Sequence, residues 1–234
     1  MEQKDRGKAQ DIQVSPPSAV KESGISRRKF FQMGLGGALL GAVGSKFVPF
    51  SQAMEEVKSE YALIIDLNKC TGCGACELAC NQRNELPEGK SFIQRLPRGE
   101  KPDCWCLPVQ CQHCVDAPCE DVCPAGATYH HATGVVLVDE KMCVGCKYCA
   151  VACPYGGRVY DEHTGVVSKC WLCLDWVLGG GEPACVQACV GGARIFGRRD
   201  DPEIAGILAS GRAQSLHPEF GTEPGIVYYI FPGS

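Results

Sequence analysis

The sequence predicts an α+β fold assembled from a repeated unit of a short strand, a cysteine-bearing loop and a short helix. The 234 residues include 18 cysteines, most of them in tight groups, together with 28 glycines and 15 prolines that favour loops over long regular elements. An apolar run at residues 62–66 recurs 73 positions later at residues 135–139, and each run ends four residues before a cysteine. Two such units would form one module, and two modules would account for the whole pattern.

The first 53 residues predict an export signal. Arg27 and Arg28 precede an apolar run at residues 33–48, and small residues suited to a signal peptidase follow at residues 51–53. The arginine pair resembles a twin-arginine signal, which implies export of the already folded protein to the periplasm. Glycines, a serine and a lysine make the run weakly hydrophobic, so a signal, cleaved or retained, is favoured over a stable anchor.

The part of the chain beyond residue 53 is acidic. It keeps 15 of the 23 basic and 23 of the 27 acidic residues, a formal charge of −8. No basic patch for nucleic acid is therefore expected. No later run reaches about 18 uninterrupted apolar residues, so no direct membrane span is expected in the mature chain. Membrane association is expected to go through a partner.

Sixteen of the cysteines form four motifs of four. Motifs one and three share the spacing C-x2-C-x2-C-x3-C, whereas motif two is C-x2-C-x4-C-x3-C and motif four is C-x2-C-x11-C-x3-C. The members are, in order, Cys70, Cys73, Cys76 and Cys80; Cys111, Cys114, Cys119 and Cys123; Cys143, Cys146, Cys149 and Cys153; and Cys170, Cys173, Cys185 and Cys189. Cys104 and Cys106 stand outside the motifs.

Three kinds of chemistry compete for these cysteines. Disulfides fit poorly, because cysteines two residues apart compete with one another and nine bridges would not favour one repeated template. Zinc fits better, but zinc sites join two C-x2-C pairs rather than a triplet and a single cysteine. The spacing of motifs one and three is that of bacterial ferredoxins, in which three thiolates cap one iron-sulfur cluster and the fourth ligates its neighbour. Iron-sulfur clusters are therefore the favoured interpretation.

The expected elements complete two-cluster ferredoxin modules. Gly72 and Gly145 precede the second cysteine of their loops, where a positive φ lets backbone N–H groups approach a cluster. Pro124 and Pro154 follow the last cysteine of their motifs and fix the direction in which the chain leaves the site. In chain order we expect strands at 62–65, 135–138 and 194–196, helical turns at 77–79 and 150–152, and a short helix at 204–208 before an irregular tail.

The run from Cys111 to Phe196 closely resembles the four-cluster iron-sulfur subunits of molybdopterin oxidoreductases of the dimethyl sulfoxide reductase family. It contains CQHCVDAPCEDVCP, CVGCKYCAVACPYGGRVY, KCWLC and PACVQACVGGARIFG, and the resemblance extends over about residues 60 to 200. The end of motif four, followed by Asp200-Asp201-Pro202, looks most like the subunits of tetrathionate, arsenate or selenate reductases.

The resemblance implies four [4Fe-4S] clusters with ligands drawn from paired motifs. Motif one pairs with motif four, and motif two with motif three. The implied ligand sets are Cys70, Cys73, Cys76 and Cys189; Cys80, Cys170, Cys173 and Cys185; Cys111, Cys114, Cys119 and Cys153; and Cys123, Cys143, Cys146 and Cys149. The corresponding domains are a signal at 1–53, an outer module at 54–100 plus 165–199, an inner module at 101–164 and a C-terminal tail at 200–234.

The implied function is electron transfer without catalysis. A molybdopterin-containing catalytic subunit at one end, and a quinol-interacting membrane subunit or a cytochrome at the other, are the implied partners in anaerobic respiration. A stand-alone polyferredoxin and a zinc-rich interaction module are the alternatives. Several conspicuous residues are not expected to bind metal. Cys104 and Cys106 are expected to be free thiols, His113 to be a packing group or a group that contacts the ligands, and Trp171 and Trp176 to pack against the loop of motif four.

Overall fold

The computed structural model describes residues 59–99 and 105–233. The predicted signal at residues 1–53 and Cys104 lie outside the described residues. The elements run in the order β1 (Tyr61–Asp66), α2 (Ala75–Arg83), β2 (Gln94–Arg98), β3 (Trp105–Val109), α3 (Pro118–Asp121), β4 (Thr128–His130), β5 (Val136–Val138), α4 (Tyr148–Ala152), β6 (Val159–Tyr160), β7 (Val167–Ser168), α5 (Leu174–Leu178), α6 (Ala184–Gln187), β8 (Arg194–Arg198), α7 (Pro202–Ala209), β9 (Ala213–Ser215), the 3-10 helix η1 (Pro218–Phe220) and β10 (Val227–Ile230).

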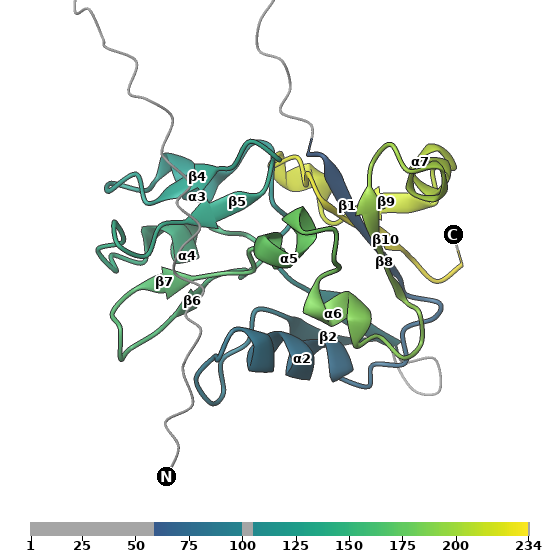
Figure 1. Ribbon diagram of the computed structural model, residues 1–234, viewed down its shortest axis with the longest axis horizontal. Helices are drawn as coiled ribbons and strands as arrows, with labels where there is room; N and C mark the ends of the chain where they lie inside the picture. The colour runs from purple at the N-terminus through teal and green to yellow at the C-terminus, as the bar shows by residue number, and fades with distance from the viewer. Residues whose placement is uncertain (1–58, 100–104, 234) are drawn as a thin grey trace, which may run out of the picture. The chain divides into compact units, whose positions relative to one another are not determined.

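The largest sheet has the strand order β8-β1-β10-β9 (Figure 1). Strand β1 pairs antiparallel with β8 and parallel with β10, so Leu63 lies opposite both Phe196 and Val227. Every residue of β1 is buried, which suits a run of apolar residues in a central strand. The strands expected at 62–65 and 194–196 are therefore confirmed, and they are partners.

The C-terminal segment corrects one expectation. The predicted helix at 204–208 lies within α7, but the residues that follow are not irregular. Strand β10 occupies a central position beside β1, and Tyr229 and Val227 in it are fully buried. The four consecutive residues of β10, valine, two tyrosines and isoleucine, have high strand propensity. The segment after α7 therefore completes the sheet.

Three two-stranded ribbons carry the other loops. Strand β2 pairs with β3, β4 with β5 and β6 with β7, all antiparallel. Strand β5 confirms the strand expected at 135–138, and the helical turns expected at 77–79 and 150–152 lie within α2 and α4. Helix α2 contacts α6, and helix α3 contacts α4 (Figure 1). Ferredoxin-like α+β is the class that this mixture of short elements supports.

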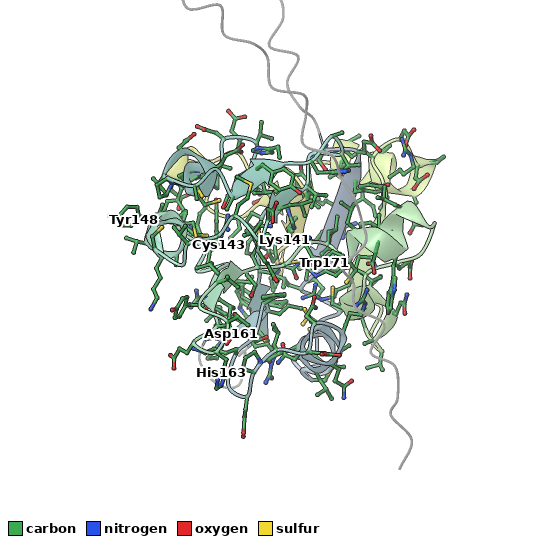
Figure 2. All side chains as sticks on the ribbon, turned by 60° about the vertical axis from the view of Figure 1, so that its left-hand side comes forward. Lys141, Cys143, Tyr148, Asp161, His163 and Trp171 are labelled. Carbon is green, nitrogen blue, oxygen red and sulfur yellow. The ribbon has the colours of Figure 1, made fainter. Side chains whose placement is uncertain are left out.

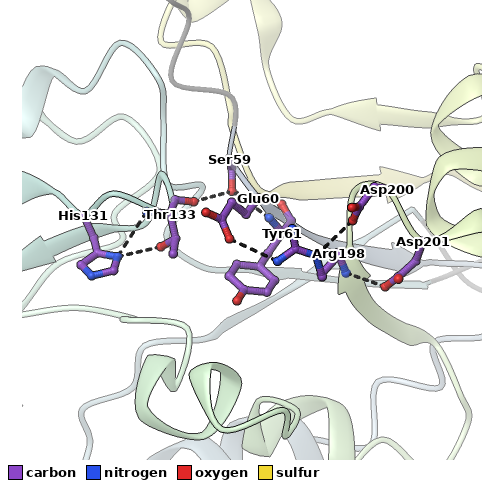
Figure 3. A network of polar contacts seen from close by, with 8 residues as sticks. All are labelled: Ser59, Glu60, Tyr61, His131, Thr133, Arg198, Asp200 and Asp201. Carbon is purple, nitrogen blue, oxygen red and sulfur yellow. Dashed lines mark hydrogen bonds and ion pairs between the residues drawn. The ribbon is translucent and has the colours of Figure 1, made fainter.

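A polar network ties the start of β1 to the turn between β4 and β5 (Figure 3). The backbone N–H of Glu60 donates to the carbonyl of Thr133 over 3.1 Å, and a Cβ at Gly134 would lie 2.6 Å from Cα of Ser59. On the other side, Arg198 of β8 pairs with Glu60 at 3.3 Å and with Asp200 at 3.1 Å. These contacts fix the position at which β1 begins and thus where the loop of motif one follows.

Buried cysteines share the core with ordinary apolar side chains. Cys114, Cys119 and Cys149 pack in the same buried cluster as Leu63 and Ile65. The sheet therefore supplies a conventional core alongside the cysteine-lined sites. Among the described residues, no helix is long and apolar enough to cross a membrane.

Candidate iron-sulfur sites

The first cavity, site A, lies where β1 gives way to α2. Its lining cysteines are Cys70, Cys73, Cys76 and Cys189, which are one of the ligand sets expected from the sequence, together with Cys106. The loop turns sharply because Gly72 has φ +67° and Gly74, the residue before α2, has φ +82°. Motif one therefore supplies three thiols from one tight loop, and motif four supplies the fourth.

The second cavity, site B, is lined by Cys80, Cys170, Cys173 and Cys185. Cys80 reaches it because it lies at the sixth position of α2, one helical turn past Cys76. The amide of Asn84 donates to the sulfur of Cys80 over 3.5 Å and receives a hydrogen bond from the indole of Trp171 over 2.5 Å. The fourth cysteine of motif one thus joins motif four rather than the other three cysteines of its own motif.

Site C gathers Cys111, Cys114, Cys119 and Cys153. Cys114 interacts electrostatically with each of the other three. Backbone N–H groups point at two of the sulfurs, since His113 donates to Cys111 and Gly157 donates to Cys153, each over 3.4 Å. The chain approaches closely here, because a Cβ at Gly157 would lie 3.1 Å from Cα of Cys111.

Site D, the third cavity, is lined by Cys123, Cys143, Cys146 and Cys149. The backbone N–H of Val167 in β7 donates to the sulfur of Cys143 over 3.4 Å. Tyr148, the first residue of α4, is exposed near Cys143 at the edge of the molecule (Figure 2). Sites C and D thus exchange their fourth cysteines, as sites A and B do.

The four sites form a series in which neighbouring cysteines interact. Cys185 of site B interacts with Cys76 of site A, Cys170 of site B interacts with Cys111 of site C, and Cys149 of site D interacts with Cys119 of site C. Exposed cysteines occur only at the two ends of this series in the described chain, at Cys73 and Cys146. Sites B and C are the buried middle.

Burial raises the pKa of several thiols of the middle sites. Burial is the main cause that raises the pKa of Cys80 and that of Cys114, each to about 12. At two cysteines of the end sites the pKa is lowered instead, although burial raises that of Cys149 in site D. The backbone N–H of Ala75 lowers the pKa of Cys73, and at Cys123 burial is outweighed by the N–H groups of Thr128 and its neighbours, which lower the pKa. Buried thiols such as Cys80 and Cys114 therefore ionise more readily when a bound metal compensates the charge of the thiolate.

Iron-sulfur clusters fit these residues. Each site offers four thiols, which is the number of ligands that a [4Fe-4S] cluster takes. Buried N–H groups also lack acceptors within the described protein, namely Nη2 of Arg158 and Nη2 of Arg194. A cluster supplies sulfide acceptors for such donors, and hydrogen bonds to its sulfurs help to set its potential.

Residues that sequence analysis left outside the ligand sets have structural partners. His113 is fully buried, and its Nδ1 accepts a hydrogen bond from the backbone of Val136 over 3.2 Å. Burial lowers its pKa well below the usual value, and Lys169 and Arg158 add to the effect. Trp171 and Trp176 both stack on Arg83, whose guanidinium carbon lies 5.4 and 4.5 Å from their rings. His113 is thus packed in the core and hydrogen-bonded through its backbone to the sulfur of Cys111, and the two tryptophans pack on Arg83.

The other four histidines also have partners, and two of them lie near cysteine motifs. His130 pairs with Glu120 and with the carbonyl of Cys114. The backbone N–H of His163 donates to the carboxylate of Asp161 over 2.8 Å; both residues are labelled in Figure 2. His130 therefore joins β4 to α3 and to the loop of motif two, whereas the contact of His163 is local to the turn between β6 and β7.

The sequence did not reveal that Cys106 belongs to a site. It lies on β3, and a Cβ added to Gly72 would lie 3.0 Å from Cβ of Cys106. Its position beside site A follows from the pairing of β2 with β3. The spacing of cysteines in the sequence does not predict this pairing. Arg158 and Arg194 were missed as well, although each follows the last cysteine of its motif by five residues.

Comparisons with known proteins agree on one family. Residues 102–199 match a 4Fe-4S dicluster domain and residues 61–82 match a 4Fe-4S binding domain. A tetrathionate reductase subunit from Salmonella typhimurium is 39% identical over 220 residues, which cover 87% of each chain. The thiosulfate reductase electron transfer subunit of Salmonella typhi is 42% identical over 64% of this chain and 82% of its own length.

A third relative belongs to a complex named as a dehydrogenase. This sulfite dehydrogenase subunit from Allochromatium vinosum is 38% identical over 71% of this chain and 81% of its own length. The thiosulfate reductase relative is named as an electron transfer subunit, and both domain matches of this chain are to 4Fe-4S domains. The chain belongs to the family of [4Fe-4S] electron-transfer subunits of these oxidoreductase complexes.

Proposed function

We propose that this chain relays electrons through four [4Fe-4S] clusters, between a quinol-interacting membrane subunit or a cytochrome and a molybdopterin-containing catalytic subunit in anaerobic respiration. The observation that carries the proposal is the series of four cysteine quartets in which only the end sites have exposed cysteines among the residues described. Bound clusters supply one-electron transfer. The protein's part is to hold them in a row and to keep the middle ones away from water.

The ligand sets proposed for the clusters are the quartets of sites A to D. They divide the chain into two nested modules, with sites A and B in residues 54–100 plus 165–199 and sites C and D in residues 101–164. The contacts of α2 with α6 and of α3 with α4 support this division, because each pair joins two motifs of one module. The segment at 200–234 then belongs with the outer module through β10.

Both ends of the series carry exposed apolar side chains suited to partners. Around site D, Val144 is 68% exposed and Val151 is 86% exposed, with Tyr148 beside them. Around site A, Leu78 is 60% exposed and Val190 is 85% exposed. Apolar surface next to an electron-transfer site is what a docked subunit would cover. A single charge placed at either end should therefore reveal which end meets the catalytic subunit.

Anaerobic purification from the native cell through a C-terminal tag tests the function. A brown preparation with about sixteen irons per chain, a molybdopterin subunit and a membrane subunit or cytochrome is expected. Recovery of the loaded chain alone would favour the stand-alone carrier, and a colourless zinc-loaded chain would overturn the proposal. Fractionation of the cells should recover the chain from the periplasmic face of the membrane, and substitution of both Arg27 and Arg28 by lysine should leave it in the cytoplasm.

Docking at the two ends can be separated with single charges. Val151→Asp at site D and Val190→Asp at site A should keep full iron content but each lose one partner on purification. Leu178→Asp, on the exposed end of α5, is the matched control, because Leu178 is 52% exposed and lies at neither end site. If Leu178→Asp also lost partners on purification, the effects of Val151→Asp and Val190→Asp would not be specific to the two end sites.

A further inference from the structure

Three buried basic side chains have no carboxylate partner in the described part of the chain. Arg194 is 5% exposed, Lys169 is 3% exposed and Arg158 is 9% exposed. The salt bridges of the described residues include none of them. An uncompensated buried charge is costly, so burial of three calls for anions of another kind.

Arg194 lies between sites A and B. Its Nη1 donates to the sulfur of Cys185 in site B over 3.5 Å and to the side-chain oxygen of Gln110 over 2.8 Å. It also interacts with Cys76 of site A and lines the cavity of that site. Its Nη2 has no acceptor in the described protein. Burial opposes the charge, but Cys185 and Cys76 outweigh it and raise the pKa of Arg194 above its ordinary value.

Arg158 occupies the corresponding place between sites C and D. It interacts with Cys119 and Cys111 of site C and with Cys149 of site D. Its Nη1 donates to the hydroxyl of Thr128 over 3.3 Å, and its Nη2 has no acceptor in the described protein. The two arginines therefore have the same relation to two different pairs of sites.

The sequence repeats the same relation. Arg158 is the fifth residue after Cys153, and Arg194 is the fifth residue after Cys189. Both segments contain a pair of neighbouring glycines and lead directly into a strand, since β6 begins after Arg158 and β8 begins at Arg194. Each of the two modules therefore carries a buried arginine at the same position of the repeat.

Lys169 lies between the two modules. Its Nζ donates to the carbonyl of Cys170 over 2.7 Å and to the carbonyl of Val136. Its charge acts on Cys170 of site B and on Cys119 of site C. The order along the series is therefore site A, Arg194, site B, Lys169, site C, Arg158 and site D.

We propose that these three cations are tuning residues, each of which raises the reduction potential of the two clusters between which it lies. The inference rests on the ligand sets proposed above. A [4Fe-4S] core carries less positive charge than its four thiolates carry negative charge, so each loaded site is an anion that becomes more negative on reduction. A fixed buried cation stabilises the reduced form more than the oxidised form, because the low dielectric leaves the charges weakly screened.

The transfer step itself changes little in the protein. One electron leaves the reduced site and one electron arrives at the oxidised neighbour, while no bond forms or breaks and no proton moves. The cation between the two sites keeps its charge throughout. Because it acts on both, it raises both potentials together. In the order given above, two cations act on each middle site and one on each end site, which offsets the cost of adding negative charge to the buried middle.

Redox titration followed by electron paramagnetic resonance tests the proposal on the anaerobically purified full chain. At the wild-type midpoint, Arg194→Gln should lower the ratio of reduced to oxidised cluster about tenfold at sites A and B, which equals about 59 mV for a one-electron couple. Sites C and D should be unchanged. Arg158→Gln should lower this ratio at sites C and D and leave sites A and B unchanged. Lys169→Gln should lower it at sites B and C. Cys73→Ser and Cys146→Ser assign the signals of sites A and D.

The controls separate charge from shape and from the ligand assignment. Arg199→Gln is the matched control, because Arg199 is part-buried but contacts the carbonyl of Gly225 and the ring of Tyr228 rather than a thiol. Arg194→Lys and Arg158→Lys should restore the potentials. Full iron with unchanged potentials in the glutamine variants would overturn the inference. Loss of iron in both the glutamine and the lysine variants would also overturn it. Loss of iron in the glutamine variants alone would support it, because the positive charge would then be needed beside the clusters. A wild-type chain without clusters would instead overturn the proposed function.

Discussion

The loops of motifs one and three have the same cysteine spacing but different continuations. In the first, α2 runs for nine residues through Cys80, whereas in the second, α4 runs for only five and ends before Cys153. The residue after the fourth cysteine differs: Asn81 allows the helix to continue, and Pro154 does not. One ligand pattern is therefore compatible with two backbone exits.

The surroundings of the two loops differ as well. Gly72 and Gly145 both have φ +67°, but a Cβ at Gly145 would lie 2.1 Å from the carbonyl oxygen of Gly165, and one at Gly72 would meet Cβ of Cys106 at 3.0 Å. Backbone faces the second loop, and a side chain faces the first. Spacing therefore fixes which thiols converge, while distant segments fix how much change each loop tolerates.

Loss of a fourth cysteine should have the largest effect, and it should fall on the neighbouring site. We expect Cys153→Ser to remove the resonance signal of site C and about a quarter of the iron, because Cys153 lies with Cys111, Cys114 and Cys119. Cys80→Ser should do the same to site B. Iron analysis and electron paramagnetic resonance measure both. Loss confined to the signal of site D in Cys153→Ser would contradict the exchange of ligands.

Substitution of Gly72 and of Gly145 by alanine should show how differently the two loops tolerate an added Cβ. Gly145→Ala should lower the free energy of unfolding by about 3–4 kcal/mol, because neither the positive φ nor the approach of Gly165 leaves room for Cβ. Gly72→Ala should cost about 1–2 kcal/mol, since only the side chain of Cys106 must shift. Thermal unfolding of the iron-loaded proteins gives the comparison. Gly126→Ala is the control for positive φ alone, with nothing within 4 Å. Equal losses at Gly72 and Gly145 would refute the contrast.

The residues that follow the fourth cysteine of motifs one and three can be exchanged. Asn81→Pro should destabilise the protein by about 3 kcal/mol, because proline removes a helical hydrogen bond and clashes within α2. Pro154→Asn should cost less than about 1 kcal/mol, since Pro154 lies beyond α4. Circular dichroism and thermal unfolding measure the two changes. A large loss in Pro154→Asn alone would show that the proline, rather than the helix, holds the loop of motif three.

What the sequence could predict follows the same division. The four cysteine motifs were recognisable from their spacing, and the pairing of the motifs was implied by the resemblance to a known family. The expected strands at 62–65 and 194–196 were recognisable as short apolar runs. The strand β10 was not, because its short run gives no sign of its parallel partner β1, far away in the chain. Cys106 was assigned no site for a similar reason: it approaches Gly72 only through the ribbon of β2 and β3. Tertiary pairing decided these two features.

The smallest effect is expected at the thiol that distinguishes site A from site D. Cys106 lines site A together with four other cysteines, and no fifth cysteine of the described chain lines site D. Burial raises the pKa of Cys106, with a further contribution from Cys70, so the free thiol is the favoured form. Cys106→Ser should therefore keep all of the iron and change the free energy of unfolding by less than about 1 kcal/mol. Cys76→Ser, the matched ligand variant, should lose the signal of site A. If Cys106→Ser lost that signal too, one of the four cysteines proposed for site A would not be a ligand, and the two loops would differ in their ligands as well as in their surroundings.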